Sequence, residues 1–401
     1  MELERHRSRA TCVGTGALLG VCLTLGSMAQ GAAPLATAPA QAGAQDDALA
    51  VPSLYQALAE YFPVGVAIAP NDITGPHAAV LKRHFNSIVA ENDMKWARLR
   101  PSEAGFTFEP ADSLVAFARA NHMLVRGHTL VWHKQNPLWL FKDAGGNDMQ
   151  PTPQNKALLL ARLERHVREV VLHYRGDVYA WDVVNEVIDP SAPDGFRRSP
   201  WFLITGTDYI ETAFRVAREA APKAKLFIND YDTTDPVKRH YLYNLVRDLK
   251  GRGVPIDGVG HQMHSNIDCP SPSDLVETVN MFAALGVDNQ ITELDMSMYH
   301  TSTDSYSAIP GEALARQGFR YRDFFAAFRS LKGKISGVTF WGVADDHTWL
   351  SRFPIARLDV PLLFDKELRA KPAFWGIVDP QRLPALDGAS IKARKGPSPG
   401  Q

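Results

Sequence analysis

Two glutamates, Glu186 and Glu293, have the sequence context of residues that do acid–base chemistry. Each lies at the end of a predicted buried strand, within the segments Trp181–Glu186 and Ile291–Asp295. A carboxylate in such a strand is costly to bury unless it is paired or functional. Two carboxyl groups on either side of a glycosidic bond can cleave it, one by protonating the leaving oxygen and the other by attacking the anomeric carbon. The alternative is that both glutamates only form structural salt bridges. Their positions at strand ends, where functional residues of such folds lie, disfavour this alternative.

A histidine and an aspartate are expected to support Glu293. Side chains two residues apart on a strand point to the same side, which pairs Glu293 with Asp295 and Gln262 with His264. His264 can therefore reach Glu293 from the neighbouring strand, with Asp295 orienting or charging it. His261 lies three residues before His264 and faces the opposite side, which disfavours a zinc site made from both.

The adjacent residues Asn185 and Glu186 require a change in the backbone if both are to enter the cleft. Neighbouring residues on a regular strand point to opposite faces, so both cannot enter one cleft. We therefore predict that the strand ends or bulges at this point.

Further polar and aromatic side chains gather at the ends of the predicted strands. They are Glu91, Asn92, Lys95, His128, Trp132, Asn229, Tyr231, Gln262, Trp341 and Trp349. Aromatic faces can stack on sugar rings, while amide, imidazole and ammonium groups can bind hydroxyls, so the set predicts a polar cleft with aromatic walls. Any single tryptophan here could instead be a core residue, and a buried histidine bonded to a neighbour is the alternative for His128.

The elements that must position these residues are short apolar strands that alternate with amphipathic helices. The predicted strands are Val64–Ile68, Ser87–Asn92, Leu124–Trp132, Val178–Glu186, Lys225–Tyr231, Gly258–His264, Gln290–Asp295 and Gly337–Val343. Several are continuous runs rich in Val and Ile, as expected for strands buried on both faces of a parallel sheet. Thr152-Pro153, Asp235-Pro236 and Ser271-Pro272 mark helix starts, since apolar residues at helical spacing follow each of them.

This alternation favours an α/β fold, a closed (β/α)8 TIM barrel formed by a single catalytic domain, over an open doubly wound sheet. In such barrels functional residues lie at the carboxyl ends of the strands, where the polar residues of this chain fall. No Gly-rich fingerprint follows any predicted strand, which argues against dinucleotide binding.

The N-terminal segment 1–29 has the pattern of a signal peptide. A basic start with three arginines precedes a short apolar run, and Ser27-Met28-Ala29 supplies small residues for cleavage. The apolar run is too short for a stable membrane-spanning helix, which disfavours an uncleaved anchor. We expect export to the periplasm or the medium, with no membrane association after signal removal.

Composition divides the rest of the chain into three segments. Residues 30–50 are rich in Ala, Gln, Pro and Gly and are predicted to be a disordered lead-in. Residues 381–401 show no hydrophobic pattern and are predicted to be a disordered tail. Between them, residues 51–380 form one block with no linker-like interruption, which we assign to the catalytic domain.

The charge balance excludes some classes of partner. The chain has 43 Lys+Arg and 44 Asp+Glu, so it offers no electrostatic case for binding nucleic acid or an anionic membrane. A neutral polymer such as a polysaccharide fits this balance better. The arginines Arg197, Arg198, Arg320 and Arg322 are interpreted as exposed surface charge.

A set of motifs resembles that of glycoside hydrolase family 10. The motifs are Glu91-Asn92 with Lys95, Gly127–His133, Trp181–Glu186, Ile291–Asp295 and Phe340–Val343. Each motif alone is moderately specific, but all of them in this order, each at a barrel strand end, make the match highly specific. The resemblance covers essentially the whole block 51–380.

The resemblance implies a retaining endo-1,4-β-xylanase that binds xylan and xylo-oligosaccharides and needs no metal or cofactor. It implies Glu186 as acid/base and Glu293 as nucleophile, with support from Asn185, His264 and Asp295. The sugar contacts that it implies are Glu91, Asn92, Lys95, His128, Trp132, Gln135, Asn229, Tyr231, Gln262, Trp341 and Trp349. We also expect the protein to be a monomer.

Three other functions remain open on the sequence alone. A related barrel glycanase could act on another β-linked backbone, and products from xylan, cellulose and mixed-linkage glucan would distinguish the two. A non-catalytic xylan-binding protein could keep the barrel, although two intact carboxylates argue against it. A metal-dependent hydrolase would need a cluster of ligand residues that the sequence does not reveal.

Overall fold

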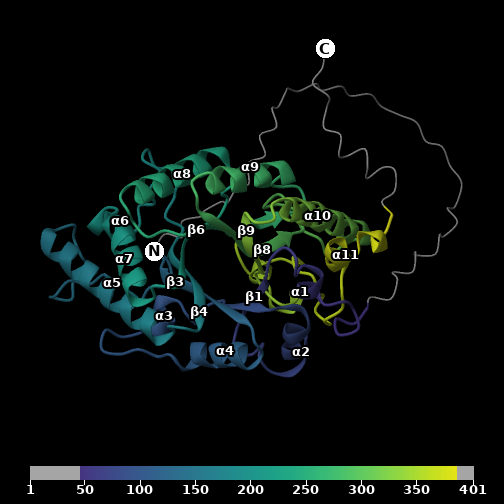
Figure 1. Cartoon of the computed structure of the whole chain (residues 1–401), viewed down its shortest axis with the longest axis horizontal. Helices are drawn as coiled ribbons and strands as arrows, with labels where there is room; N and C mark the ends of the chain where they lie inside the picture. Colours follow the sequence, from purple (N-terminus) through teal and green to yellow (C-terminus); the bar gives the residue numbers. More distant parts are fainter. Residues whose placement is uncertain (1–45, 386–401) are drawn as a thin grey trace, which may run out of the picture.

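The computed structural model describes residues 46–385, and its core is a closed barrel of eight parallel strands (Figure 1). The barrel strands are β1 (Val64–Ile68), β2 (Ser87–Ala90), β3 (Leu124–Val131), β4 (Val178–Asn185), β5 (Lys225–Asp230), β6 (Gly258–His261), β8 (Asp288–Ser297) and β9 (Ile335–Phe340). Strands that follow one another in this series pair in parallel, and the ring closes through the pairing of β9 with β1. The predicted (β/α)8 TIM barrel is confirmed.

Helices surround the strands, as Figure 1 shows. The longer helices are α2 (Gly75–His84), α4 (Glu109–Ala120), α5 (Pro153–His173), α7 (Asp208–Ala220), α8 (Pro236–Gly251), α9 (Pro272–Ala283) and α10 (Gly311–Ser330). The shorter helical segments are α1 (Leu54–Ala57), α3 (Trp96–Leu99), α6 (Pro200–Thr205), α11 (Pro372–Val378) and the 3-10 turns η1 (Asp345–His347), η2 (Trp349–Ser351) and η3 (Pro380–Arg382). Because all barrel strands run in one direction, the loops that follow them share one end of the barrel.

The predicted helix starts are confirmed by their caps. The Thr152 side chain accepts a hydrogen bond from the N–H of Asn155 at the start of α5, and Asp235 accepts two backbone bonds at the start of α8. Ser271 and Asp274 form a reciprocal capping box at the start of α9. These caps satisfy backbone N–H groups that have no partner within the helix.

One predicted strand is interrupted. The sequence predicts a continuous strand over Gly258–His264, but β6 ends earlier and a separate strand, β7 (His264–Asn266), follows. Between them Met263 has a φ of +59°, a left-handed conformation that a continuing strand cannot contain. β7 pairs with β8 so that His264 lies opposite Asp295.

The residues that the structure describes reach slightly beyond the predicted catalytic block. The predicted signal peptide lies outside the described residues, as do most of the predicted lead-in and tail. Asp46 and Arg382, which the sequence assigns to those two segments, form an ion pair of 2.6 Å, and Ala48 is fully buried. Residues 46–50 and 381–385 therefore belong to the folded part of the chain that the structure describes. Among the helices of residues 46–385, none has the length and apolar character needed to cross a membrane.

Candidate active site

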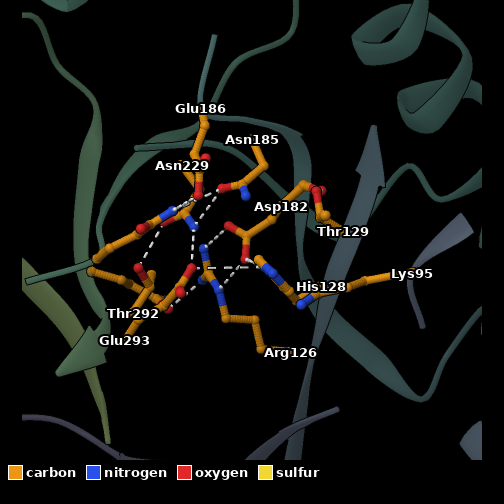
Figure 2. Close-up of polar contacts among 12 residues, drawn as sticks. Lys95, Arg126, His128, Thr129, Asp182, Asn185, Glu186, Asn229, Thr292 and Glu293 are labelled. Carbon is orange, nitrogen blue, oxygen red and sulfur yellow. Dashed lines mark hydrogen bonds and ion pairs between the residues drawn. The ribbon is translucent and has the colours of Figure 1, made fainter. Parts of the chain in front are cut away.

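Glu186 and Glu293 meet at the carboxyl end of the barrel, where their side chains point towards a shared space (Figure 2). Gln262 Nε2 donates to Oε1 of Glu186 at 3.3 Å and to Oδ1 of Asn185 at 3.1 Å. Asn229 Nδ2 donates to the same Asn185 oxygen at 2.9 Å and to Oε1 of Glu293 at 2.7 Å. A continuous series of hydrogen bonds therefore fixes the two carboxyl groups relative to one another.

Glu186 lies where the strand breaks, as the sequence predicts. β4 ends at Asn185, and Glu186 has a φ of +56°, in the left-handed region that few residues other than glycine adopt. The N–H of Glu186 donates to the carbonyl of Asn229 at 2.9 Å. This turn allows two adjacent side chains to face the same space, and such local strain is typical of functional sites.

An arginine that the sequence places on the surface holds the backbone of Glu186 instead. Arg197 is only 8% exposed, and its Nε donates to the carbonyl of Glu186 at 2.7 Å. Its Nη2 donates to the carbonyl of Ile188 at 3.1 Å and to the Tyr231 hydroxyl at 2.8 Å. The surface interpretation of Arg197 is wrong because the loop after β4 folds back over it. Arg320, interpreted in the same way, is also buried.

Glu293 is held in its ionised form by its neighbours. Burial alone would raise its pKa, but a hydrogen bond from His264 and the nearby imidazoles of His128 and His264 lower the pKa below its usual value. Nδ1 of His128 lies 4.0 Å from Oε1 of Glu293. A carboxylate that remains charged although only 4% exposed is suited to attack an electron-poor carbon.

His264 lies between two carboxylates, the contact that the strand pattern predicts. Its Nε2 is 3.1 Å from Oε2 of Glu293, and its Nδ1 is 3.0 Å from Oδ2 of Asp295. Burial favours the neutral imidazole, but the charge of Asp295 and the hydrogen bonds to both carboxylates raise the pKa of His264 to about 10. Trp349 Nε1 donates to the same Asp295 oxygen at 2.8 Å. Asp295 therefore fixes the positions of both His264 and Trp349.

The raised pKa of His264 predicts a loss of stability at high pH. The folded-state pKa of about 10 lies above the ordinary value of 6.5, so the stabilisation is fully present below pH 6.5 and is lost as the pH rises through 10. The free energy of unfolding should fall in this window by up to about 1.4 kcal/mol per pH unit from this group. Denaturant titrations of the protein and of His264→Asn should show the difference in stability shrinking from pH 6.5 to 10. A difference that stays constant across this window would contradict the charged state of His264.

Asn229 bridges groups inside the site and does not form a wall of the cleft. The sequence places it among the sugar contacts, but it is fully buried. Its Nδ2 donates to Asn185 and Glu293, and its Oδ1 accepts from Thr292 Oγ1 at 2.7 Å. A Cβ at Gly260 would lie 2.2 Å from this oxygen, so the neighbouring strand needs glycine there. The predicted sugar contact by Asn229 is therefore corrected to a positioning contact.

A second side of the site follows β2 and β3, where the structure brings several predicted sugar contacts together. Lys95 Nζ donates to Oδ1 of Asn92 at 3.1 Å and lies 4.9 Å from the centre of the Trp132 ring. Gln135 Nε2 donates to the same Asn92 oxygen at 3.2 Å. Burial lowers the pKa of Lys95, and carboxylates around it, including Glu91, offset this effect only in part.

Aromatic rings complete the site, as the sequence predicts. Trp349 packs against the cluster formed by Trp341, Ala67 and Val89, and the Trp341 ring centre lies 5.3 Å from that of His128. The Trp349 ring centre lies 4.9 Å from that of His264. The half-buried Tyr231 stands on the opposite side, beyond the end of β5, where its hydroxyl accepts the bond from Arg197.

A buried ion pair beneath the site is absent from the sequence predictions. Arg126 and Asp182 are each 1% exposed and are joined by a contact of 2.5 Å between Nη2 and Oδ1 (Figure 2). Despite burial, the charge of Arg126 and the hydrogen bond from His128, 3.0 Å long, keep the pKa of Asp182 below its usual value. Arg126 lies two residues before His128 on β3 and so shares its face. A charge inside a buried strand needs a partner, which is the signal that could have revealed this pair.

Comparison with known proteins agrees with this architecture. The family model of glycosyl hydrolase family 10 matches residues 53–380. A thermostable celloxylanase from Thermoclostridium stercorarium is 50% identical over 348 residues, which cover 84% of this chain and 90% of that protein. Endo-1,4-beta-xylanase A from Halalkalibacterium halodurans is 48% identical over 347 residues, covering 82% of this chain and 87% of that protein.

Solved structures give the same result. The crystal structure of xylanase B from Clostridium stercorarium F9 superimposes with a TM-score of 0.81 at 50% sequence identity, and the match covers 82% of this chain and 100% of that one. Sequence, fold and site geometry therefore agree that the chain belongs to glycosyl hydrolase family 10.

Proposed function

We propose that this protein is a retaining endo-1,4-β-xylanase that hydrolyses internal β-1,4-xylosidic bonds of xylan by double displacement. The observation that carries the proposal is the unequal environment of the two glutamates. Glu293 is buried and kept ionised by His264, whereas Glu186 follows the end of β4 and has a side chain that is 12% exposed. Membership of family 10 and the xylanase names of its relatives support this substrate.

The first step forms a glycosyl-enzyme. An oxygen of Glu293 bonds to the anomeric carbon, the glycosidic C–O bond breaks, and the proton of Glu186 moves to the leaving oxygen. In the second step a water oxygen bonds to the anomeric carbon, its proton passes to Glu186, and the ester bond to Glu293 breaks. Both glutamates return to their starting states, and two successive inversions give net retention.

The surrounding residues are assigned to sugar binding under the same proposal. The Asn185 side chain is held within hydrogen-bond distance of Asn229 and Gln262, and it is assigned to the sugar 2-hydroxyl. The sugars on the non-reducing side would be held by Glu91, Asn92, Lys95, His128, Trp132 and Gln135. The sugar beside the nucleophile would be enclosed by Gln262, Trp341 and Trp349, and Tyr231 would face the leaving side.

Product analysis tests the reaction and the substrate together. We expect xylan to give a mixture of short xylo-oligosaccharides early in the reaction, with the β-anomer appearing first in proton NMR spectra. Faster release from cellulose or mixed-linkage glucan would instead indicate another β-glycanase. Failure to cleave both xylan and an aryl xylobioside would indicate a binding protein. Profiles from arabinoxylan and glucuronoxylan would then define which decorations are accepted.

Export through the N-terminal signal is part of this proposal. The basic start, the apolar run and the small residues of segment 1–29 support it. An enzyme that acts on a polymer outside the cell must also be exported to reach it. Cell fractionation with N-terminal sequencing of the mature protein would test it. Sizing of the purified protein by light scattering would test the expectation of a monomer.

The hydrogen bond from Arg197 to the backbone carbonyl of Glu186 predicts that Arg197 positions the acid/base residue. Replacing Arg197 with methionine keeps the volume but removes the donors to Glu186, Ile188 and Tyr231. We expect kcat on xylan to fall about 10- to 100-fold with KM nearly unchanged, because small misplacements of an acid/base group are costly. The matched control is Arg198→Met, since the Arg198 side chain is 44% exposed. Equal kcat values in the two variants would contradict this role.

A further inference from the structure

Outside the active site, a cluster of histidines and aspartates joins the first and last loops of the barrel. Asp72 follows β1, His77 lies in the first turn of α2, and Asp346 and His347 belong to η1, which follows β9. The ring of strands closes between β1 and β9. His77 and Asp346 are therefore in contact although 269 residues separate them in the sequence.

The ligand atoms of this cluster have the spacing of a metal site. One ligand atom each from Asp72, His77 and His347 all lie within 4.8 Å of one another. His347 Nδ1 is 3.4 Å from Asp72 Oδ1, and Asp346 Oδ2 is 3.0 Å from His77 Nε2 and 3.9 Å from His347 Nδ1. In a tetrahedral site with bonds of about 2.0–2.1 Å, the ligand atoms lie about 3.3 Å apart. Asp72, His77 and His347 therefore suit three positions of such a site, and Asp346 lies beside them.

The surroundings orient these ligands. Asp72 is only 6% exposed, and its Oδ2 accepts the N–H of Ala69 at 2.7 Å, which leaves Oδ1 facing the cluster. Such outer hydrogen bonds are typical of metal ligands. The two imidazole rings lie next to each other, with their centres 5.2 Å apart. A divalent cation bound between these imidazoles would balance the negative charge of the neighbouring aspartates.

We propose that Asp72, His77 and His347 form a structural site for a zinc-type divalent cation, with Asp346 beside it. Two imidazole nitrogens with a carboxylate oxygen suit Zn²⁺ or Co²⁺, whereas Ca²⁺ and Mg²⁺ favour sites made of oxygen ligands alone. The bound ion ties the loop after β1 to η1. η1 leads directly to η2, which carries Trp349, so the ion also steadies the segment that lies beside His264.

Metal titration of the untagged, chelator-stripped protein tests this site. The measurements are Zn²⁺ binding by competition with a chromophoric chelator, the visible absorption of the Co²⁺ form, and the unfolding midpoint with and without Zn²⁺. The variants are His77→Ala and His347→Ala. The matched control is His240→Ala, an exposed histidine on α8 whose ring bonds to Asn244 at 2.9 Å. Activity on xylan at ambient temperature verifies that each variant is folded.

We expect the protein and the control to bind one Zn²⁺ per chain, to show the intense visible bands of tetrahedral Co²⁺, and to unfold at a higher temperature with Zn²⁺. Each variant should lose at least about 100-fold in affinity, since losses of 10- to 100-fold follow even from outer-sphere changes. Chelation should leave turnover at ambient temperature unchanged. Absence of stoichiometric Zn²⁺ binding by the unaltered protein, or variants that retain its affinity, would overturn the proposal independently of the xylanase assignment.

Discussion

Replacing Glu293 with alanine should reduce kcat on xylan by about 10⁵-fold while leaving the fold intact, because removal of a nucleophile removes the covalent route itself. Loss of the carboxylate should leave the other hydrogen bonds of the site in place. Asn229 keeps its bond to Asn185, and His264 keeps its contact with Asp295. Circular dichroism and the unfolding midpoint should therefore stay close to those of the unaltered protein. Steady-state hydrolysis of xylan and of an aryl xylobioside would measure the loss.

The stereochemistry of rescue identifies what Glu293 does. In Glu293→Ala, azide can occupy the vacated space and attack from the side that the carboxylate used, so 2,4-dinitrophenyl xylobioside should give an α-configured glycosyl azide. Glu293→Gln should be equally inactive but resistant to rescue, because the amide fills that space. Glu164→Ala, the same chemical change at an exposed position of α5, is the matched control. Near-normal turnover in Glu293→Ala, or an azide product of β configuration, would remove the nucleophile assignment.

The sequence predicts those parts of the site that depend on local pattern. Period-two alternation along β8 places Glu293 and Asp295 on one face, and the adjacency of Asn185 and Glu186 requires the strand end that the structure shows. Buried parallel strands and proline-marked helix starts are equally local signals, so the barrel itself could be predicted. Each of these inferences needs only neighbours in the chain.

The remaining features depend on contacts between distant segments. Arg197 resembles any loop arginine until the loop after β4 folds back and brings it to the carbonyl of Glu186. The side chain of Asn229 would also suit sugar binding. Only the folded structure, in which β4 and β8 lie close to it, shows that its amide is already bonded to Asn185, Glu293 and Thr292. The left-handed Met263 has no sequence signal, because glycine is the residue that usually marks such a position.

Removal of the acid/base should produce a defect that depends on the leaving group. For Glu186→Ala, hydrolysis of xylan should fall by about 10³-fold or more, since a sugar alkoxide cannot leave without a proton. Formation of the glycosyl-enzyme from 2,4-dinitrophenyl xylobioside should be nearly unimpaired, because dinitrophenolate needs no protonation. Water is then no longer activated, so the second step becomes limiting. We expect a burst of dinitrophenolate equal to the enzyme concentration, followed by slow turnover with a lowered KM.

The two glutamates can then be distinguished by one reagent. Azide needs no general base, so it should attack the accumulated glycosyl-enzyme of Glu186→Ala and give a β-configured azide, opposite to the product of Glu293→Ala. Glu186→Gln should show the same dependence on the leaving group, which separates loss of the proton donor from loss of side-chain volume. Equal losses on xylan and on the dinitrophenyl substrate would mean that Glu186 does not deliver the proton. Its strained backbone and the clamp by Arg197 would then need an explanation other than placing an acid beside the leaving oxygen.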